Sequence, residues 1–122
     1  MLTNDALIRL CRAKDMLREV QDRPLTIHEV ANEVAMSPYH FIRQFKSVFG
    51  QTPHECRIQA RLEQAKRLLI VSDDSVTEVC MALGYSSMGS FSELFTQRVG
   101  IAPSQYRRKI RTLVQIPLTP WK

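Results

Sequence analysis

The amino-acid sequence predicts an all-α protein of seven helices, organised as two helix-turn-helix subdomains joined by a long linker helix. Apolar residues recur every three or four positions, which is the period of a helix and not of a strand. Only four of the 122 residues are glycine, and the glycines and prolines separate the periodic segments. The pattern of the first half of the chain then returns in the second half, which indicates an internal repeat.

The first predicted helix covers residues 4–21. Its apolar positions follow the helical period, so we expect them to face the core. They are Leu7, Leu10, Cys11, Ala13, Leu17 and Val20.

Two kinds of signal mark the starts of later helices. A Ser or Thr followed three residues later by Glu forms a capping box, in which each side chain accepts a hydrogen bond from the other residue's backbone N–H. This pattern occurs at Thr26 with Glu29, Thr52 with Glu55, and Ser75 with Glu78. Proline at the first helical position is tolerated because its missing N–H would have no partner there, as at Pro38, Pro53 and Pro103. We therefore expect helices over 27–34, 38–49, 53–71, 76–82, 88–99 and 103–110.

The internal repeat relates two copies that are displaced by 49 or 50 residues. Glu29, Val30, Val34 and Ser37 correspond to Glu78, Val79, Leu83 and Ser86, and Phe41, Phe45, Gly50, Pro53 and Arg57 correspond to Phe91, Phe95, Gly100, Pro103 and Arg107. Each copy holds a short helix, a tight turn and a second helix, which is the helix-turn-helix plan. The expected organisation is a first subdomain at 1–51, a linker helix at 52–71, a second subdomain at 72–112 and an extended C-terminal tail at 113–122.

The turn between the two helices of each copy differs in one residue type. Small residues, Ala31 and Cys80, stand where the helices are expected to cross. The second turn carries Gly84, which adopts a positive φ at little cost. Ala35 occupies the matching place in the first turn, so it must adopt that conformation at some cost or bend differently.

The outward face of each second helix is a candidate for reading DNA. Turning Phe41 and Phe45 inward sends five residues outward, Tyr39, His40, Arg43, Lys46 and Ser47, with Ile42 at the boundary. Arg43 suits a guanine edge, Tyr39 and Ile42 suit a thymine methyl, and Lys46 suits a phosphate. The same projection in the later copy exposes Gly89, Ser90, Glu93, Thr96 and Gln97, with Met88 near the leading end. On that neutral to acidic face, Glu93 can accept from a cytosine amine.

The predicted linker helix has about 19 residues and therefore a length of about 28 Å. DNA presents the same groove every ~34 Å, so a connector of this length can hold two helices in successive major grooves. One chain would then read an asymmetric site as a monomer. Basic residues on the linker and the last helix are available to phosphates; they are Arg57, Arg61, Lys66, Arg67, Arg107, Arg108, Lys109 and Arg111.

Composition narrows the function classes. The chain has 17 Lys and Arg against 12 Asp and Glu, and its isoelectric point is near 9.4, which permits an acidic partner such as nucleic acid. Three cysteines without a Cys-x-x-Cys pair favour neither a metal site nor a disulfide framework, so we expect a reducing cytoplasm and no cofactor. No apolar run approaches the ~20 residues that span a membrane.

The second copy resembles the signature of AraC/XylS-family transcription regulators. The resemblance rests on Ser75 through Ser86, followed by Phe91, Phe95, Gly100, Pro103, Tyr106 and Arg107 at the family's spacing, and on a linker helix with Arg57, Arg61, Leu62, Ala65, Leu68 and Leu69. It implies a two-lobed DNA-binding domain that recruits or contacts RNA polymerase. The family's base-reading positions fall on Tyr39, Ile42, Arg43, Met88, Gly89, Ser90 and Glu93. Contacts to the DNA backbone are expected from Thr26, Ser37, His40, Lys46, Ser86, Ser87, Gln97, Arg107 and Arg108.

Two other functions are compatible with part of the sequence pattern. Some DNA-repair enzymes carry a similar helical module beside a reactive cysteine, but no cysteine here has a positioned His and Asp or a second cysteine in its sequence neighbourhood. We therefore expect no enzymatic activity. The other alternative is an adaptor whose second lobe mainly contacts RNA polymerase or another protein, which the polar face with Glu93 motivates.

Overall fold

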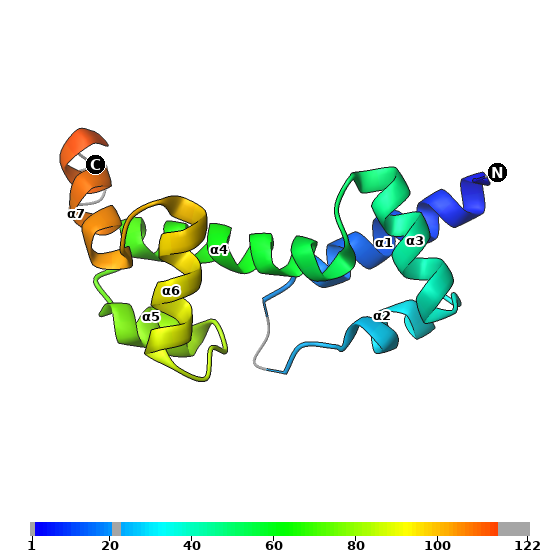
Figure 1. The fold of residues 1–122 in the computed structure, drawn as a ribbon, viewed down its shortest axis with the longest axis horizontal. Helices are drawn as coiled ribbons and strands as arrows, with labels where there is room; N and C mark the ends of the chain where they lie inside the picture. Colours follow the sequence, from blue (N-terminus) through cyan, green and yellow to red (C-terminus); the bar gives the residue numbers. More distant parts are fainter. Residues whose placement is uncertain (1, 21–22, 115–122) are drawn as a thin grey trace, which may run out of the picture. The chain divides into compact units, whose positions relative to one another are not determined.

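The computed structural model describes residues 2–20 and 23–114, and these residues form an all-α fold with seven helices (Figure 1). This confirms the predicted fold class. The helices are α1 (Asn4–Arg18), α2 (Ile27–Glu33), α3 (Pro38–Phe49), α4 (Pro53–Val71), α5 (Val76–Ala82), α6 (Met88–Val99) and α7 (Pro103–Val114). The chain divides into two compact units between Arg61 and Leu62, inside α4.

The first unit is held together by the apolar faces of α1, α2, α3 and the first half of α4. Phe41 and Phe45 of α3 are fully buried, and their ring centroids lie 5.6 Å apart in an edge-on arrangement. The core around them contains Leu10, Ala13, Leu17, Val30, Ala31, Val34 and Cys56. Packing of aromatic rings against aliphatic side chains supplies most of the stabilisation of such a small core.

The second unit contains the rest of α4 together with α5, α6 and α7. Phe91 and Phe95 are fully buried, and a row of rings runs from Tyr85 through both of them to Tyr106 of α7. Val79, Cys80 and Leu83 of α5 and Leu62, Ala65 and Leu69 of α4 are buried as well. Each unit therefore buries a pair of phenylalanines from one helix, α3 in the first unit and α6 in the second.

The two tight turns have the same backbone conformation. Ala35 has a φ of 58° and Gly84 a φ of 82°, both in the left-handed region. The Met36 N–H donates to the carbonyl of Ala31, five residues earlier, as Tyr85 does to Cys80. This is the Schellman pattern of helix ends. Ala35 therefore adopts the left-handed conformation instead of bending differently.

Three expectations about the ends of the chain were wrong. The first helix ends at Arg18 rather than at residue 21, because Glu19 is already extended with a ψ of 127°. Leu7 and Cys11 are exposed rather than inward, since the buried stripe of α1 is narrow and consists of Leu10, Ala13 and Leu17. Residues 113–114 of the predicted tail are the last turn of α7, while residues 115–122 lie outside the described residues.

Candidate nucleic-acid interface

The second helix of the first helix-turn-helix copy, α3, buries one face and exposes the other. Its first turn is capped by Ser37, whose Oγ accepts from the backbone N–H of His40 at 3.3 Å, and Pro38 follows at the first helical position. Tyr39, opposite the buried phenylalanines, is 71% exposed, and Ile42, at the boundary of the two faces, is 37% exposed. The cap and the core pair thus hold the helix so that its polar face meets solvent.

Tyr39 and Arg43 form a side-chain pair on this exposed face. One terminal nitrogen of Arg43 donates to the Tyr39 hydroxyl at 3.3 Å, and the centre of the guanidinium lies 5.5 Å from the ring centroid. Residues four apart are neighbours on a helix, so the contact is local and independent of other elements. It limits the rotamers of Arg43 before any ligand arrives, which lowers the entropy that binding has to remove.

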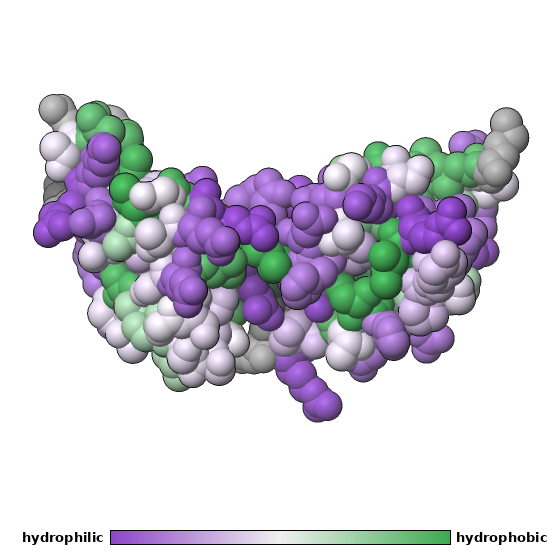
Figure 2. Space-filling view, in the orientation of Figure 1, coloured by the Kyte–Doolittle hydropathy of each residue, from purple (hydrophilic) through white to green (hydrophobic). Residues whose placement is uncertain are grey.

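The second helix of the second helix-turn-helix copy, α6, is built in the same way but presents a different surface. Ser87 is its N-cap, and the Ser87 Oγ accepts from the Ser90 N–H at 3.1 Å and donates to the Ser90 Oγ at 2.9 Å. Met88 is 37% exposed, and Gly89 is exposed with open space around it. Figure 2 shows a mostly pale surface near the turn between α5 and α6, the colour of residues of intermediate hydropathy.

Side chains of α6 also line a shallow open depression. Its lining residues are Ser92, Glu93, Thr96 and Gln97, from successive turns of the outward face. Glu93 is exposed and carries the only formal charge among these four residues. The outward face of α6 is therefore neutral to acidic, as predicted, whereas that of α3 carries Arg43 and Lys46.

The residues predicted to contact the DNA backbone differ in their surroundings. Most of them are exposed; these are Thr26, Ser37, His40, Lys46, Ser86, Ser87, Gln97 and Arg108. Thr26 is the N-cap of α2, where its Oγ1 accepts from the Glu29 N–H at 3.1 Å and a Glu29 carboxylate oxygen accepts from the Thr26 N–H at 2.8 Å. These bonds hold the pKa of Glu29 below its ordinary value.

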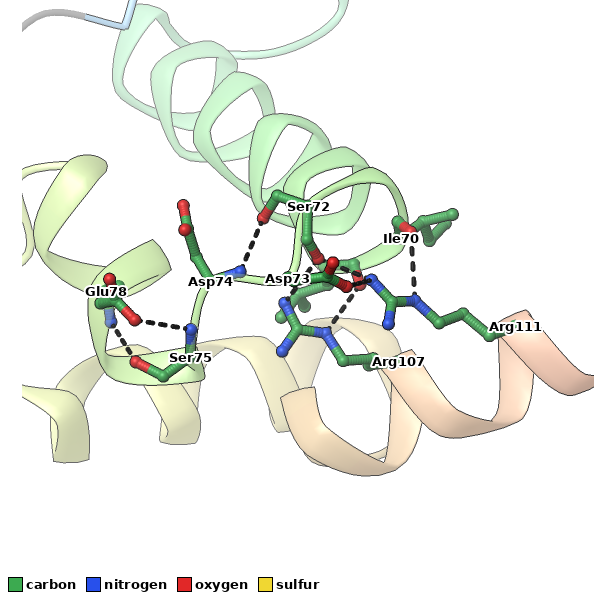
Figure 3. Close-up of polar contacts among 9 residues, drawn as sticks. Ile70, Ser72, Asp73, Asp74, Ser75, Glu78, Arg107 and Arg111 are labelled. Atoms are coloured by element: carbon green, nitrogen blue, oxygen red, sulfur yellow. Dashed lines mark hydrogen bonds and ion pairs between the residues drawn. The ribbon is translucent and has the colours of Figure 1, made fainter. Parts of the chain in front are cut away.

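Arg107 differs from the other residues predicted to contact the DNA backbone, because its guanidinium donates hydrogen bonds within the protein. Its Nε donates to the carbonyl of Leu69 at 2.8 Å, and its Nη2 donates to the carbonyl of Ser72 at 3.3 Å (Figure 3). The sequence did not predict this contact between α7 and the end of α4. The signal that could have indicated it is local: α4 has no basic residue in its last turn to interact with its terminal carbonyls.

Arg57 of α4 is also only partly exposed. Burial lowers the pKa of its guanidinium, and repulsion from Arg61 lowers it further.

Burial raises the pKa of the Cys80 thiol, whose Sγ lies 3.5 Å from the carbonyl of Ser87. The described residues contain no cluster of three or more side chains suited to a metal ion, and none of their helices could cross a bilayer.

Two helix-turn-helix units in one chain, each with an exposed polar face on its second helix, define a helix-turn-helix protein. The chain matches the family described as a helix-turn-helix domain over residues 30–109. It is 35% identical over 95 residues to the MmsAB operon regulatory protein of Pseudomonas aeruginosa, covering 78% of this chain and 31% of that protein. The chain therefore belongs to the AraC/XylS family of transcription regulators.

Solved structures show the same fold. An AraC-type transcriptional regulator from Chromobacterium violaceum is 25% identical, with a TM-score of 0.78 over 88% of this chain and 96% of that chain. The DNA-binding domain of AdpA, a global transcriptional factor solved in complex with a target DNA, is 30% identical, with a TM-score of 0.75 over 94% of this chain and 100% of that chain. This chain spans about a third of the length of the curated relatives that it matches.

Proposed function

We propose that this chain is the sequence-specific DNA-binding domain of a transcription regulator, and that α3 and α6 enter successive major grooves of one DNA duplex. The observation that carries the proposal is the exposed polar face of each second helix, opposite a fully buried pair of phenylalanines. The likeness to the AdpA domain, which was solved with its target DNA, supports it. The 19 residues of α4 give a helix of about 28 Å, close to the groove repeat of ~34 Å.

In the first unit, Arg43 is proposed to read a guanine. Its guanidinium is exposed and already oriented by Tyr39, and two parallel N–H donors match the O6 and N7 acceptors of guanine. Ile42 and the ring of Tyr39 supply apolar surface for a thymine methyl. Lys46, three residues beyond Arg43 and exposed, is proposed to contact a phosphate.

In the second unit, Glu93 is proposed to accept from a cytosine amine. Gly89 and Ser90 in the first turn of α6 offer little bulk, so the helix can approach the base edges closely, and Met88 adds apolar contact. A carboxylate repels phosphate, so this helix is expected to contribute specificity and little salt-dependent affinity. Backbone contacts are assigned to Ser86, Ser87, Gln97 and Arg108 here, and to Thr26, Ser37 and His40 in the first unit.

The test begins with duplexes selected from a random pool, followed by titrations at several salt concentrations. Neutralising about 5–8 phosphates predicts that the logarithm of the association constant falls with log salt at a slope of about −5 to −7. Arg43→Ala is expected to weaken binding by about 1–3 kcal/mol, mostly at one guanine, whereas Lys46→Ala should flatten the slope by about one.

Arg12→Ala is the matched control, because it removes one exposed cation from α1, which is outside the proposed interface. It should change neither the preferred sequence nor the slope. Failure of the unmodified domain to bind any selected duplex, or a slope near zero, would refute the proposed function.

A second candidate is an adaptor whose second unit mainly contacts RNA polymerase or another protein. It is favoured by the missing cation on the outward face of α6. Unchanged DNA affinity after Arg43→Ala, together with loss of a protein partner after Glu93→Arg, would favour it over DNA reading. In either case we propose a monomeric domain without catalytic activity that acts in the cytoplasm, where the chromosome of a bacterium lies.

A further inference from the structure

We propose that Arg107 and Arg111 are positioning residues: together they clamp α7 to the end of α4 and thereby set the angle at which α6 is presented to DNA. The inference rests on the proposed function, because it concerns how the second unit holds its DNA-reading helix. It departs from the expectation that Arg107 contacts phosphate.

The clamp consists of four charge-assisted hydrogen bonds to three carbonyls (Figure 3). Arg107 donates to the carbonyls of Leu69 and Ser72, as described above. Arg111, one turn later in α7, donates from Nε to the carbonyl of Ile70 at 3.1 Å and from Nη2 to the carbonyl of Ser72 at 2.6 Å. The same nitrogen lies 3.4 Å from a carboxylate oxygen of Asp73. Both guanidinium groups therefore donate to the carbonyl of Ser72, the first residue after α4.

This end of α4 needs partners from elsewhere. The last four carbonyls of a helix have no intrahelical donor. Helices α3 and α6 end at Gly50 and Gly100, which adopt the left-handed conformation. Their N–H groups donate to the carbonyls of Lys46 and Thr96. Beyond α4 the chain continues as Ser72 and Asp73, without a glycine. Cations also interact favourably with the negative end of the helix dipole, so the two arginines satisfy both requirements.

The clamp is connected to α6 through α7. Tyr106, the neighbour of Arg107, packs edge-on against Phe95 of α6 with ring centroids 5.5 Å apart. On the other side, the Ser72 hydroxyl accepts from the Asp74 N–H at 3.3 Å, and the capping box of Ser75 starts α5 directly afterwards. The end of α4 is thus tied to all three other helices of its unit, and loosening the clamp should loosen the orientation of α6.

The decisive variant is Arg107→Lys with Arg111→Lys in the same chain. Lysine keeps the charge but cannot form the planar fork that reaches two carbonyls. A phosphate contact would survive this change, whereas a geometric clamp would not. Arg98→Lys is the matched control, because Arg98 is an exposed arginine in the last turn of α6, in the same unit, and is assigned no contact with DNA or with α4.

The readout is the dependence of affinity on the spacing between the two parts of the selected site. One inserted base pair turns the second part by about 34°, and in the unmodified domain this should weaken binding about tenfold or more. In the double lysine variant we expect the penalty to fall to about threefold or less, with an unchanged salt slope. A globally unfolded fraction weakens binding at every spacing by the same factor, and an unchanged circular dichroism spectrum excludes unfolding of the second unit alone, so the ratio then isolates orientation from stability.

The two proposals fail in different ways. If the unmodified domain binds no duplex, the proposed function is lost, and hydrogen exchange still tests the clamp. The α7 amides of the double lysine variant should then exchange about fivefold faster or more than those of the Arg98→Lys control. Equal exchange and an unchanged spacing penalty would each overturn the clamp.

Discussion

Replacing Ala35 by glycine should stabilise the protein, although it removes a methyl group. Ala35 has a φ of 58°, a region in which the Cβ of an L-residue crowds the following carbonyl. Relief of that crowding is worth about 1–2 kcal/mol. The added freedom of glycine in the unfolded chain opposes it by about 0.4–1 kcal/mol. The net expectation is a gain of ~0.5–1 kcal/mol in the free energy of unfolding.

The assay is reversible urea unfolding followed by far-ultraviolet circular dichroism, with a thermal scan beside it. For a unit of this size the gain corresponds to a rise in Tm of about 2–8 °C. The reverse substitution is Gly84→Ala, since Gly84 occupies the matching turn with a φ of 82°. It should destabilise the second unit by a similar amount or more.

The opposite signs of the two substitutions are the informative result. A loss of stability in Ala35→Gly would mean that the methyl group makes contacts worth more than the backbone strain, although Ala35 is exposed. In that case the reasoning from φ alone would be refuted, whatever Gly84→Ala does.

Three further predictions concern the core, the helix caps and the proposed DNA-reading face. Phe45→Ala should cost about 3–5 kcal/mol because the ring is fully buried, and circular dichroism should show the first unit largely unfolded. Hydrogen bonds in the capping boxes lower the pKa of Glu29 and Glu78, so their stabilisation is present above the ordinary value of 4.5 and lost as pH falls through the lowered pKa. Acid titration of the Glu-to-Gln variants should show a shallower loss of stability over that range. Tyr39→Phe removes the hydroxyl that holds Arg43 and should weaken DNA binding by about 0.5–1.5 kcal/mol, with fold stability unchanged.

Helix positions could be predicted from the sequence wherever a local signal marks the boundary. The capping boxes at Thr26 and Ser75 and the glycines at 50 and 100 act within one turn, and the helices next to them were predicted to within one residue. The end of α1 carries no glycine or proline, so the apolar period alone overestimated its length. The last turn of α7 extends into residues predicted as tail, because no glycine or proline between Pro103 and Pro117 marks the end of the helix.

The exposure of the candidate interface could be predicted for a similar reason. Once two phenylalanines per helix are assigned to the core, the helical period determines which residues face outward. The role of Arg107 could not be predicted in this way, since its partners Leu69 and Ser72 lie 38 and 35 residues away. Periodicity gives the direction in which a side chain leaves its helix, but not the element that it meets there.

Comparison of the two copies of the internal repeat shows which positions packing constrains and which exposed positions can differ between the copies. Both copies keep the buried phenylalanine pair, the capping box and the left-handed turn, because each of these positions is constrained by its neighbours in the unit. The outward faces are free of that constraint and have diverged: Arg43 corresponds to Glu93, and Lys46 corresponds to Thr96. A guanidinium and a carboxylate favour opposite base edges, guanine and cytosine. Under the proposed function the two units would therefore read different sequences, and a single chain is expected to recognise an asymmetric site in one orientation.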